Sequence, residues 1–190
     1  MKKVFLVLII LFSYSCRNAE EKFVSEFPDS TKHRIEFLEK DFYIPSHYKK
    51  ASLGGVFQKK LQDRDSTNPI YRNKQLYQQL LESSADFEYF IDESNPANSI
   101  TFVLGEYVLL NKKNMYSFAE ILRKQNPNRD LLEKKFYNLS YADVVKVKFR
   151  NKAEMFTTQY LISRGSKTIS MIVVNSENED YDHLIKNFSI

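Results

Sequence analysis

The chain has 190 residues, with 28 basic and 24 acidic side chains and a single cysteine. This length fits one domain with a sizeable core, and the small positive excess gives no argument for a nucleic-acid partner. Only four glycines and five prolines are present, which argues against long disordered or low-complexity segments. We therefore expect a folded domain that binds no nucleic acid.

The first sixteen residues have the composition of an export signal. Lys2 and Lys3 precede an unbroken apolar run of nine residues, 4–12, and Cys16 follows closely. A helix needs roughly 20 apolar residues to cross a bilayer, so this run is too short to span one. It suits the hydrophobic region of a secretory signal peptide.

This leader resembles a bacterial lipoprotein signal of the Bacteroidetes type, in which a dedicated peptidase cuts before a cysteine that carries diacylglycerol. Ser13 stands where that family usually has Leu. The resemblance implies that residues 1–15 are removed, that Cys16 is lipidated with palmitate-type chains, and that residues 16–33 form an acylated tether. It also implies a bacterial envelope location, with the outer membrane as destination. Residues 17–21 are similar to a surface-export signal, so both the periplasmic face and the cell surface stay open.

Ser13 and Ser15 leave a second interpretation of the leader. They satisfy the small-x-small rule of an ordinary signal peptidase, with cleavage at the same bond before Cys16. The mature chain would then begin with a free exported thiol, open to oxidation or cross-linking. We favour the acylated cysteine because it accounts for a lone thiol at this place.

The first half of the chain predicts strands and one helix. A strand over residues 35–44 ends at Pro45, and another strand is expected to end near Leu61. Asn68-Pro69 has the pattern of a helix start, and the apolar spacing continues that helix to about Leu81.

The next segments predict two strands and two helical segments. Residues 87–91 are expected to form a strand, and residues 100–110 a central strand, because the latter are apolar on both faces. Ser117 and Glu120 have capping-box spacing for a helix, with an apolar stripe made by Met115, Phe118, Ile121 and Leu122. Residues 131–137 predict a short helical turn.

The last third of the chain has the clearest pattern. Alternation predicts strands over residues 145–150, 154–163 and 168–174, joined by turns into an antiparallel meander. Ser176 and Glu179 predict a second capping box. The helix expected after it has an apolar face that packs back on the sheet, formed by Tyr181, Leu184, Ile185 and Phe188.

This order of elements predicts a single α+β domain over residues 34–190, a mainly antiparallel β-sheet with amphipathic helices packed on it. Residues 41–46 (Asp-Phe-Tyr-Ile-Pro-Ser) and the meander through residues 159–162 are similar to the PsbP-like family. The resemblance implies a PsbP-like sandwich and a non-enzymatic module that docks on other proteins. It transfers no site residue.

A search for catalytic patterns finds none. The chain has no Gly-rich phosphate loop, no nucleophile elbow and no zinc-protease pair of histidines. His33, His47 and His183 are scattered, whereas metal ligands usually cluster with short spacing. We therefore predict no catalytic residue, no metal site and no cofactor, and we expect His183 to be a surface residue.

Two patterns allow a binding function. The basic stripe of Lys146, Lys148 and Arg150, with Lys152 in the following turn, would suit an anionic partner such as lipid headgroups or lipopolysaccharide. A solvated face on which lysines protect an edge strand is the alternative, which we favour. A set of tyrosines would suit a small-ligand cleft, although core packing is the commoner reason for such a set: Tyr89, Tyr107, Tyr137, Tyr141 and Tyr160.

The sequence thus predicts a lipid-anchored envelope protein that works as an interaction or accessory module. Its partners would be the membrane, through the N-terminal anchor, and an envelope protein. The alternative is a small-molecule-binding or enzymatic lipoprotein with a cleft beside the C-terminal meander.

Overall fold

A computed structural model describes residues 21–52, 82, 85–125, 127–151 and 154–189. The chain divides into two compact units. The first, here called the hairpin unit, comprises Met1–Ser46 and Tyr181–Ile190, and the second, the sheet unit, comprises His47–Asp180. Cys16 and the rest of the leader lie outside the described residues.

The hairpin unit is built on two short antiparallel strands, β1 and β2. Residues 21–26 form a helix, and the elements that follow are β1 (Ser30–Ile35), the 3-10 turn η1 (Glu36–Leu38) and β2 (Lys40–Pro45). Glu39 makes the turn in the left-handed conformation, with φ 52°. The single strand predicted over residues 35–44 is therefore wrong, because Ile35 pairs with Lys40 across a hairpin. The predicted tether contains secondary structure from residue 21 on.

The last helix, η2 (Asp182–Ser189), contacts β2 within the hairpin unit. The four residues of its predicted apolar face are buried, so that face is confirmed. The helix has 3-10 geometry and begins at Asp182, so Ser176 does not cap it. The Asn187 side chain accepts a hydrogen bond from Tyr43 N at 2.7 Å and donates one to Tyr43 O at 3.0 Å. These bonds satisfy a buried amide and fix η2 on β2.

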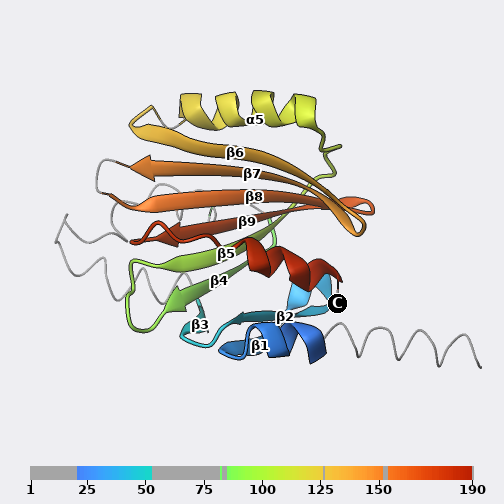
Figure 1. The fold of residues 1–190 in the computed structure, drawn as a ribbon, viewed down its shortest axis with the longest axis vertical. Helices are drawn as coiled ribbons and strands as arrows, with labels where there is room; N and C mark the ends of the chain where they lie inside the picture. The colour runs from blue at the N-terminus through green and yellow to red at the C-terminus, as the bar shows by residue number, and fades with distance from the viewer. Residues whose placement is uncertain (1–20, 53–81, 83–84, 126, 152–153, 190) are drawn as a thin grey trace, which may run out of the picture. The chain divides into compact units, whose positions relative to one another are not determined.

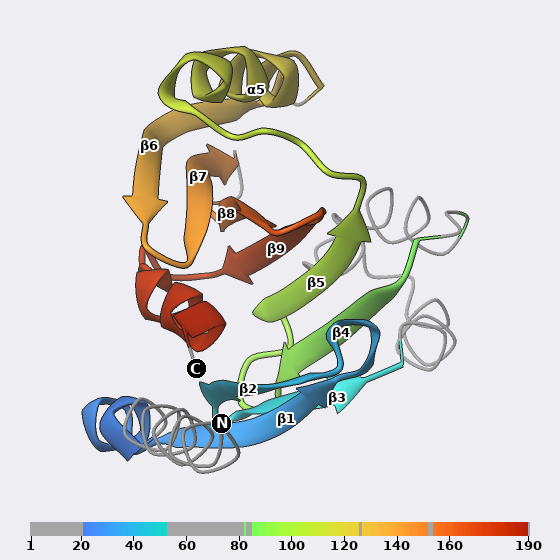
Figure 2. The same ribbon diagram turned by 90° about the vertical axis from the view of Figure 1, so that its right-hand side faces the viewer.

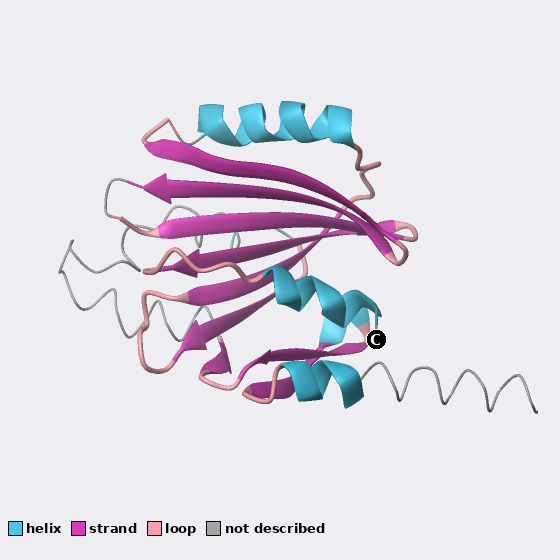
Figure 3. Ribbon diagram, viewed as in Figure 1, coloured by secondary structure: helices cyan, strands magenta, loops and turns pink. Residues whose placement is uncertain are grey.

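The sheet unit holds a seven-stranded antiparallel sheet of order β3-β4-β5-β9-β8-β7-β6. Figures 1 and 3 show its strands, and Figure 2 shows how the sheet twists from β3 to β6. Their bounds are β3 (Tyr48–Ala51), β4 (Phe87–Asp92), β5 (Ser99–Gly105), β6 (Arg129–Leu139), β7 (Ala142–Asn151), β8 (Phe156–Arg164) and β9 (Lys167–Asn175).

Most strand predictions in this unit are confirmed. The segments predicted over residues 87–91, 145–150, 154–163 and 168–174 correspond to β4, β7, β8 and β9. The central strand β5 is also found, but it ends at Gly105 instead of Leu110. The strand expected near Leu61 and the helix expected after Asn68 lie outside the described residues.

Strand β6 contradicts the helical turn predicted over residues 131–137. This segment pairs with β7 along its length. A register shift between Leu131 and Glu133 breaks the regular alternation of side chains. The bulge explains why the sequence pattern of this strand is hard to recognise.

The helix of the sheet unit is α5 (Lys112–Gln125). It begins earlier than Ser117, because the Asn111 side chain accepts hydrogen bonds from Lys113 N and Asn114 N, both at 2.9 Å. Figure 1 shows α5 beside β6. Its residues Met115 and Ala119 pack in one core cluster with Val145, Val147 and Phe149 of β7.

The stripe predicted for α5 is partly correct. Phe118 and Leu122 pack against the core cluster around Met115. Ile121 is instead 52% exposed, since the helix turns it away from the sheet. Within the described residues, no helix is long and apolar enough to cross a membrane.

Candidate functional site

Strand β7 places the predicted basic stripe on the face opposite its apolar side chains. Val145, Val147 and Phe149 lie in the core cluster with α5. On the other face, Lys146 is 0% exposed and Lys148 is 5% exposed. Both faces of this strand are therefore buried, although one of them carries ammonium groups.

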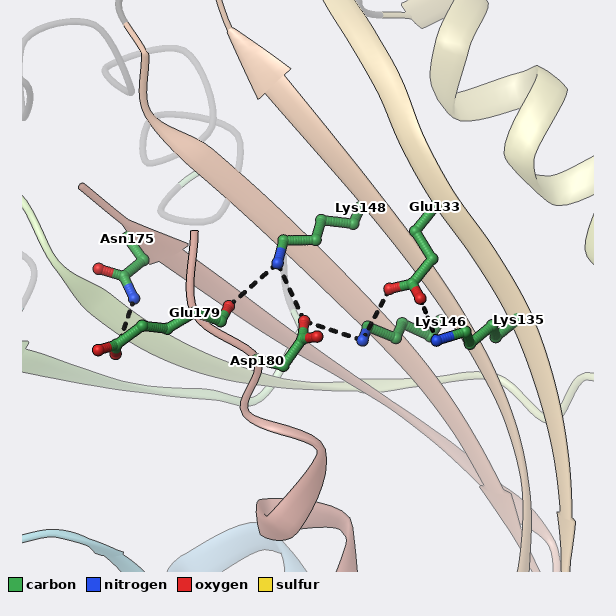
Figure 4. A network of polar contacts seen from close by, with 7 residues as sticks. All are labelled: Glu133, Lys135, Lys146, Lys148, Asn175, Glu179 and Asp180. Carbon is green, nitrogen blue, oxygen red and sulfur yellow. Dashed lines mark hydrogen bonds and ion pairs between the residues drawn. The ribbon is translucent and has the colours of Figure 1, made fainter. Parts of the chain in front are cut away.

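The two lysines converge on one acidic side chain, as Figure 4 shows. Lys146 Nζ lies 2.9 Å from Asp180 Oδ1, and Lys148 Nζ lies 3.0 Å from the same oxygen. Lys146 Nζ also lies 2.8 Å from Glu133 Oε2. Lys148 Nζ donates a second hydrogen bond, 3.2 Å long, to the backbone oxygen of Glu179. Each buried ammonium group thus has at least two oxygen partners.

Further contacts extend this set of residues, which we call the lysine network. Lys135 pairs with Glu133, and Asn175 Nδ2 lies 3.4 Å from Glu179 Oε2. Lys146 Nζ is also 5.9 Å from the centre of the Tyr160 ring. The network therefore links strands β6, β7 and β9 with the connection that follows β9.

The lysines keep the carboxylates of Glu133 and Asp180 ionised. Burial alone would raise the pKa of Asp180, but hydrogen bonds from Lys146 and Lys148 outweigh it and hold that pKa below its usual range. Burial also acts to raise the pKa of Glu133, and hydrogen bonds from Lys135 and Lys146 again lower it. Carboxylates with lowered pKa values are poor proton carriers near neutral pH. The arrangement suits charge compensation and structural cross-linking better than acid-base chemistry.

The structure gives different surroundings to the three described residues of the predicted basic stripe. Lys146 and Lys148 face internal acids and are not part of a solvated sheet face, which corrects the alternative favoured from the sequence. Arg150 has a half-exposed side chain 3.4 Å from Asp130. Lys152 lies outside the described residues. Contact between this stripe and an external anion stays a prediction.

The acidic partners of the lysines were not among the residues predicted from the sequence. Glu133 lay in the segment predicted as helical, whereas in strand β6 it stands opposite Lys148 in the register with β7. The capping box predicted from Ser176 and Glu179 placed Asp180 within the last helix, where it was given no role. A strand prediction for β6 would have pointed to Glu133, but no local pattern points to Asp180.

The histidines and tyrosines have separate environments. His183 is half-buried and stacks on Phe27, with ring centres 4.7 Å apart, and burial lowers the pKa of its imidazole. Tyr89 and Tyr160 are core residues, whereas Tyr107 is exposed. In the described part of the chain, no group of three or more His, Cys, Asp or Glu side chains could hold a metal ion.

Comparison with known proteins identifies the fold. The structure of cyanobacterial PsbP (CyanoP) from Synechocystis sp. PCC 6803 is similar with a TM-score of 0.50 and 10% identity, over 85% of this chain and 88% of that chain. A protein of unknown function from Pseudomonas aeruginosa has a TM-score of 0.39 and 13% identity, over 77% and 82%. No family model and no curated protein sequence matches the chain. The chain has a PsbP-like α+β fold, and the predicted fold class is confirmed.

Proposed function

We propose that this protein is a lipid-anchored component of a bacterial envelope that serves as a non-enzymatic interaction or accessory module. The observation that carries the proposal is the position of Cys16. It is the only cysteine of the chain, and it directly follows a short export signal. The outer membrane of a Bacteroidetes-type cell is the proposed location, on its periplasmic face or at the cell surface.

Acylation of Cys16 would be enough to hold the chain on a membrane. Each buried methylene contributes about 0.8 kcal/mol, and two acyl chains give stable anchoring where one does not. A lipoprotein cysteine carries at least the two chains of its diacylglycerol. Under this proposal the leader is removed, and attachment depends on Cys16.

The non-enzymatic character is supported by the lysine network and by the fold. The charges in the network compensate one another within the protein, and the carboxylates of Glu133 and Asp180 have lowered pKa values. Carboxylates that stay ionised near neutral pH are poorly suited to proton transfer. The PsbP-like fold is compatible with a docking module, although a fold by itself does not define a function.

Substitution of the cysteine tests the proposal. We expect Cys16→Ala to abolish labelling by radioactive palmitate and to release the protein from the membrane fraction of the native host. Ser15→Ala is the matched control, since it changes the neighbouring residue and keeps the thiol. Unchanged membrane retention of Cys16→Ala would exclude anchoring through this residue.

A further inference from the structure

The segment that joins β5 to α5 exposes three consecutive large apolar side chains. Tyr107 is 51% exposed, Val108 is 46% exposed and Leu109 is 63% exposed. Leu110, the next residue, is buried in the core cluster beneath α5. Single exposed apolar residues are common on protein surfaces, but a continuous run of three is unusual.

Hydrogen bonds hold this segment in a defined conformation. Val108 N donates to Thr168 Oγ1 at 2.8 Å. The Asn114 side chain donates to Leu109 O and accepts from Asn111 N. The backbone is therefore tied both to strand β9 and to the first turn of α5, so the exposed side chains belong to a fixed surface.

Positive charge follows directly after the apolar run. Lys112 and Lys113 are both exposed in the first turn of α5, which contains no acidic residue. Among the residues that the structure describes, neither ammonium group lies within ion-pair distance of an acid. Glu106, before the run, is the one acid of the segment. The exposed segment thus combines apolar side chains with two exposed cations.

This combination suits the interface of an anionic bilayer. Tyrosine is favoured at the level of the headgroups, and aliphatic side chains can enter the acyl boundary beneath them. Lysines beside them can extend toward lipid phosphates. Three side chains are too few for a stable protein interface, which buries about 1,200–2,000 Å² in total.

We propose that residues 107–113 form a second membrane contact, in which the three apolar side chains enter an anionic lipid surface and the two lysines meet its phosphates. This proposal rests on the proposed function, because the acyl anchor keeps the chain at the membrane. It adds a defined face of the sheet unit that touches the lipid.

The absence of tryptophan from the sequence gives a direct test. Leu109→Trp places a single indole in the segment, within the full chain carrying its own anchor. We expect its emission to shift to shorter wavelength on vesicles of phosphatidylcholine with phosphatidylglycerol, and brominated lipid to quench it. Leu132→Trp is the matched control, because Leu132 is 44% exposed on β6 outside the segment. The emission of this control variant should change little.

Charge reversal then tests the role of the lysines. Adding Lys112→Glu and Lys113→Glu to Leu109→Trp should reduce quenching at least severalfold on anionic vesicles. Fluorescence is read on the vesicle-bound fraction alone. If the acyl anchor does not hold the protein, the amount of vesicle-bound protein falls equally for every variant. If the anchor holds but residues 107–113 do not touch the lipid, the Leu109→Trp protein binds the vesicles and its indole stays unquenched.

Two outcomes would overturn the inference. One is equal quenching of the Leu109→Trp and Leu132→Trp variants on the same vesicles. The other is an emission shift of Leu109→Trp that needs no vesicles and grows with protein concentration, which would assign the segment to contact with a second copy of the chain.

Discussion

The two faces of strand β7 are both buried, but they differ in what buries them. Val145 and Val147 lie in an apolar cluster beneath helix α5. Lys146, between them in sequence, is covered by Glu133, Asp180 and the ring of Tyr160. Alternation of apolar and basic residues in this segment correctly predicts a strand, but it does not predict which face of the strand meets solvent.

The energetics of the two faces differ as well. Burying an aliphatic or aromatic side chain stabilises the fold by about 1.5–3 kcal/mol. A buried ion pair gains little over an apolar pair of similar volume, yet removal of one partner is costly because a charge is left uncompensated. The apolar face therefore supplies most of the stability, whereas the lysine network adds little net stability but is costly to break.

The largest loss of stability is expected from charge reversal on the lysine-bearing face of β7. Lys146→Glu would place a carboxylate at a fully buried position between Glu133 and Asp180. We expect the free energy of unfolding to fall by more than about 5 kcal/mol. This is enough to abolish the cooperative unfolding transition in urea, as measured by circular dichroism.

Lys167→Glu is the control for this variant, since Lys167 is exposed at the start of β9. Its stability should stay within about 0.5 kcal/mol of the wild type. A stable, cooperatively unfolding Lys146→Glu protein would contradict the buried position of this lysine. This expected instability also means that reversal at Lys146 is unsuitable as a test of lipid binding.

Truncation on the apolar face should have the next largest effect. Phe149→Ala removes a buried ring from the cluster that holds α5 on the sheet. We expect the free energy of unfolding, measured in urea, to fall by about 3–5 kcal/mol. Leu132→Ala, at an exposed position of β6, should cost far less. Equal losses in the two variants would show that Phe149 does not belong to a packed core.

A smaller, pH-dependent effect is expected at Asp180. The folded-state pKa values of Asp180 and Glu133 are lowered. Ionised carboxylates therefore add stability above their unfolded pKa of about 4, and this stability is lost as the pH falls through the folded values. Asp180→Asn should cost about 1 kcal/mol at pH 7, since the half-exposed side chain is partly screened by solvent.

Unfolding measured from pH 7 down to pH 2 checks this prediction. The difference between wild type and Asp180→Asn should shrink on acidification, because the wild type alone loses the ionised carboxylate. Glu177→Gln, on the same connection after β9, should show no such trend. A constant difference between wild type and Asp180→Asn at all pH values would contradict the assigned role of this charge.

The smallest effect is expected at the exposed end of the basic stripe. Arg150 is half-exposed and forms a surface pair with Asp130, and such pairs contribute about 0–1 kcal/mol. We expect Arg150→Glu to leave stability within about 1 kcal/mol of the wild type. Binding of lipopolysaccharide should fall less than about twofold, because the two neighbouring lysines are neutralised inside the protein. A tenfold loss would favour contact between this stripe and an external anion.

The regular alternation of apolar and polar residues made the strands β7, β8 and β9 predictable from the sequence. The helical spacing of apolar residues likewise predicted the buried face of η2. Two irregular features defeated the pattern. The β1–β2 hairpin turns at Glu39 with a positive φ and without glycine, and the bulge after Leu131 disguises β6. Capping boxes were misleading, since α5 is capped by Asn111 instead of Ser117.

The candidate site was predictable only in part. The spacing of Lys146 and Lys148 identified one face of one strand. Their main partner, Asp180, lies 34 residues after Lys146 in the sequence, and no local periodicity relates two positions so far apart. Long-range pairing of charges depends on sheet order and on the path of connections, which a pattern in one strand does not contain.

Intact mass spectrometry of the protein isolated from its native membranes tests the central claim most directly. Lipidation predicts a chain that begins at Cys16 and carries the added mass of a diacylglyceryl group and its acyl chains. A chain that begins at Cys16 with an unmodified thiol, or one that retains residues 1–15, would contradict the anchor.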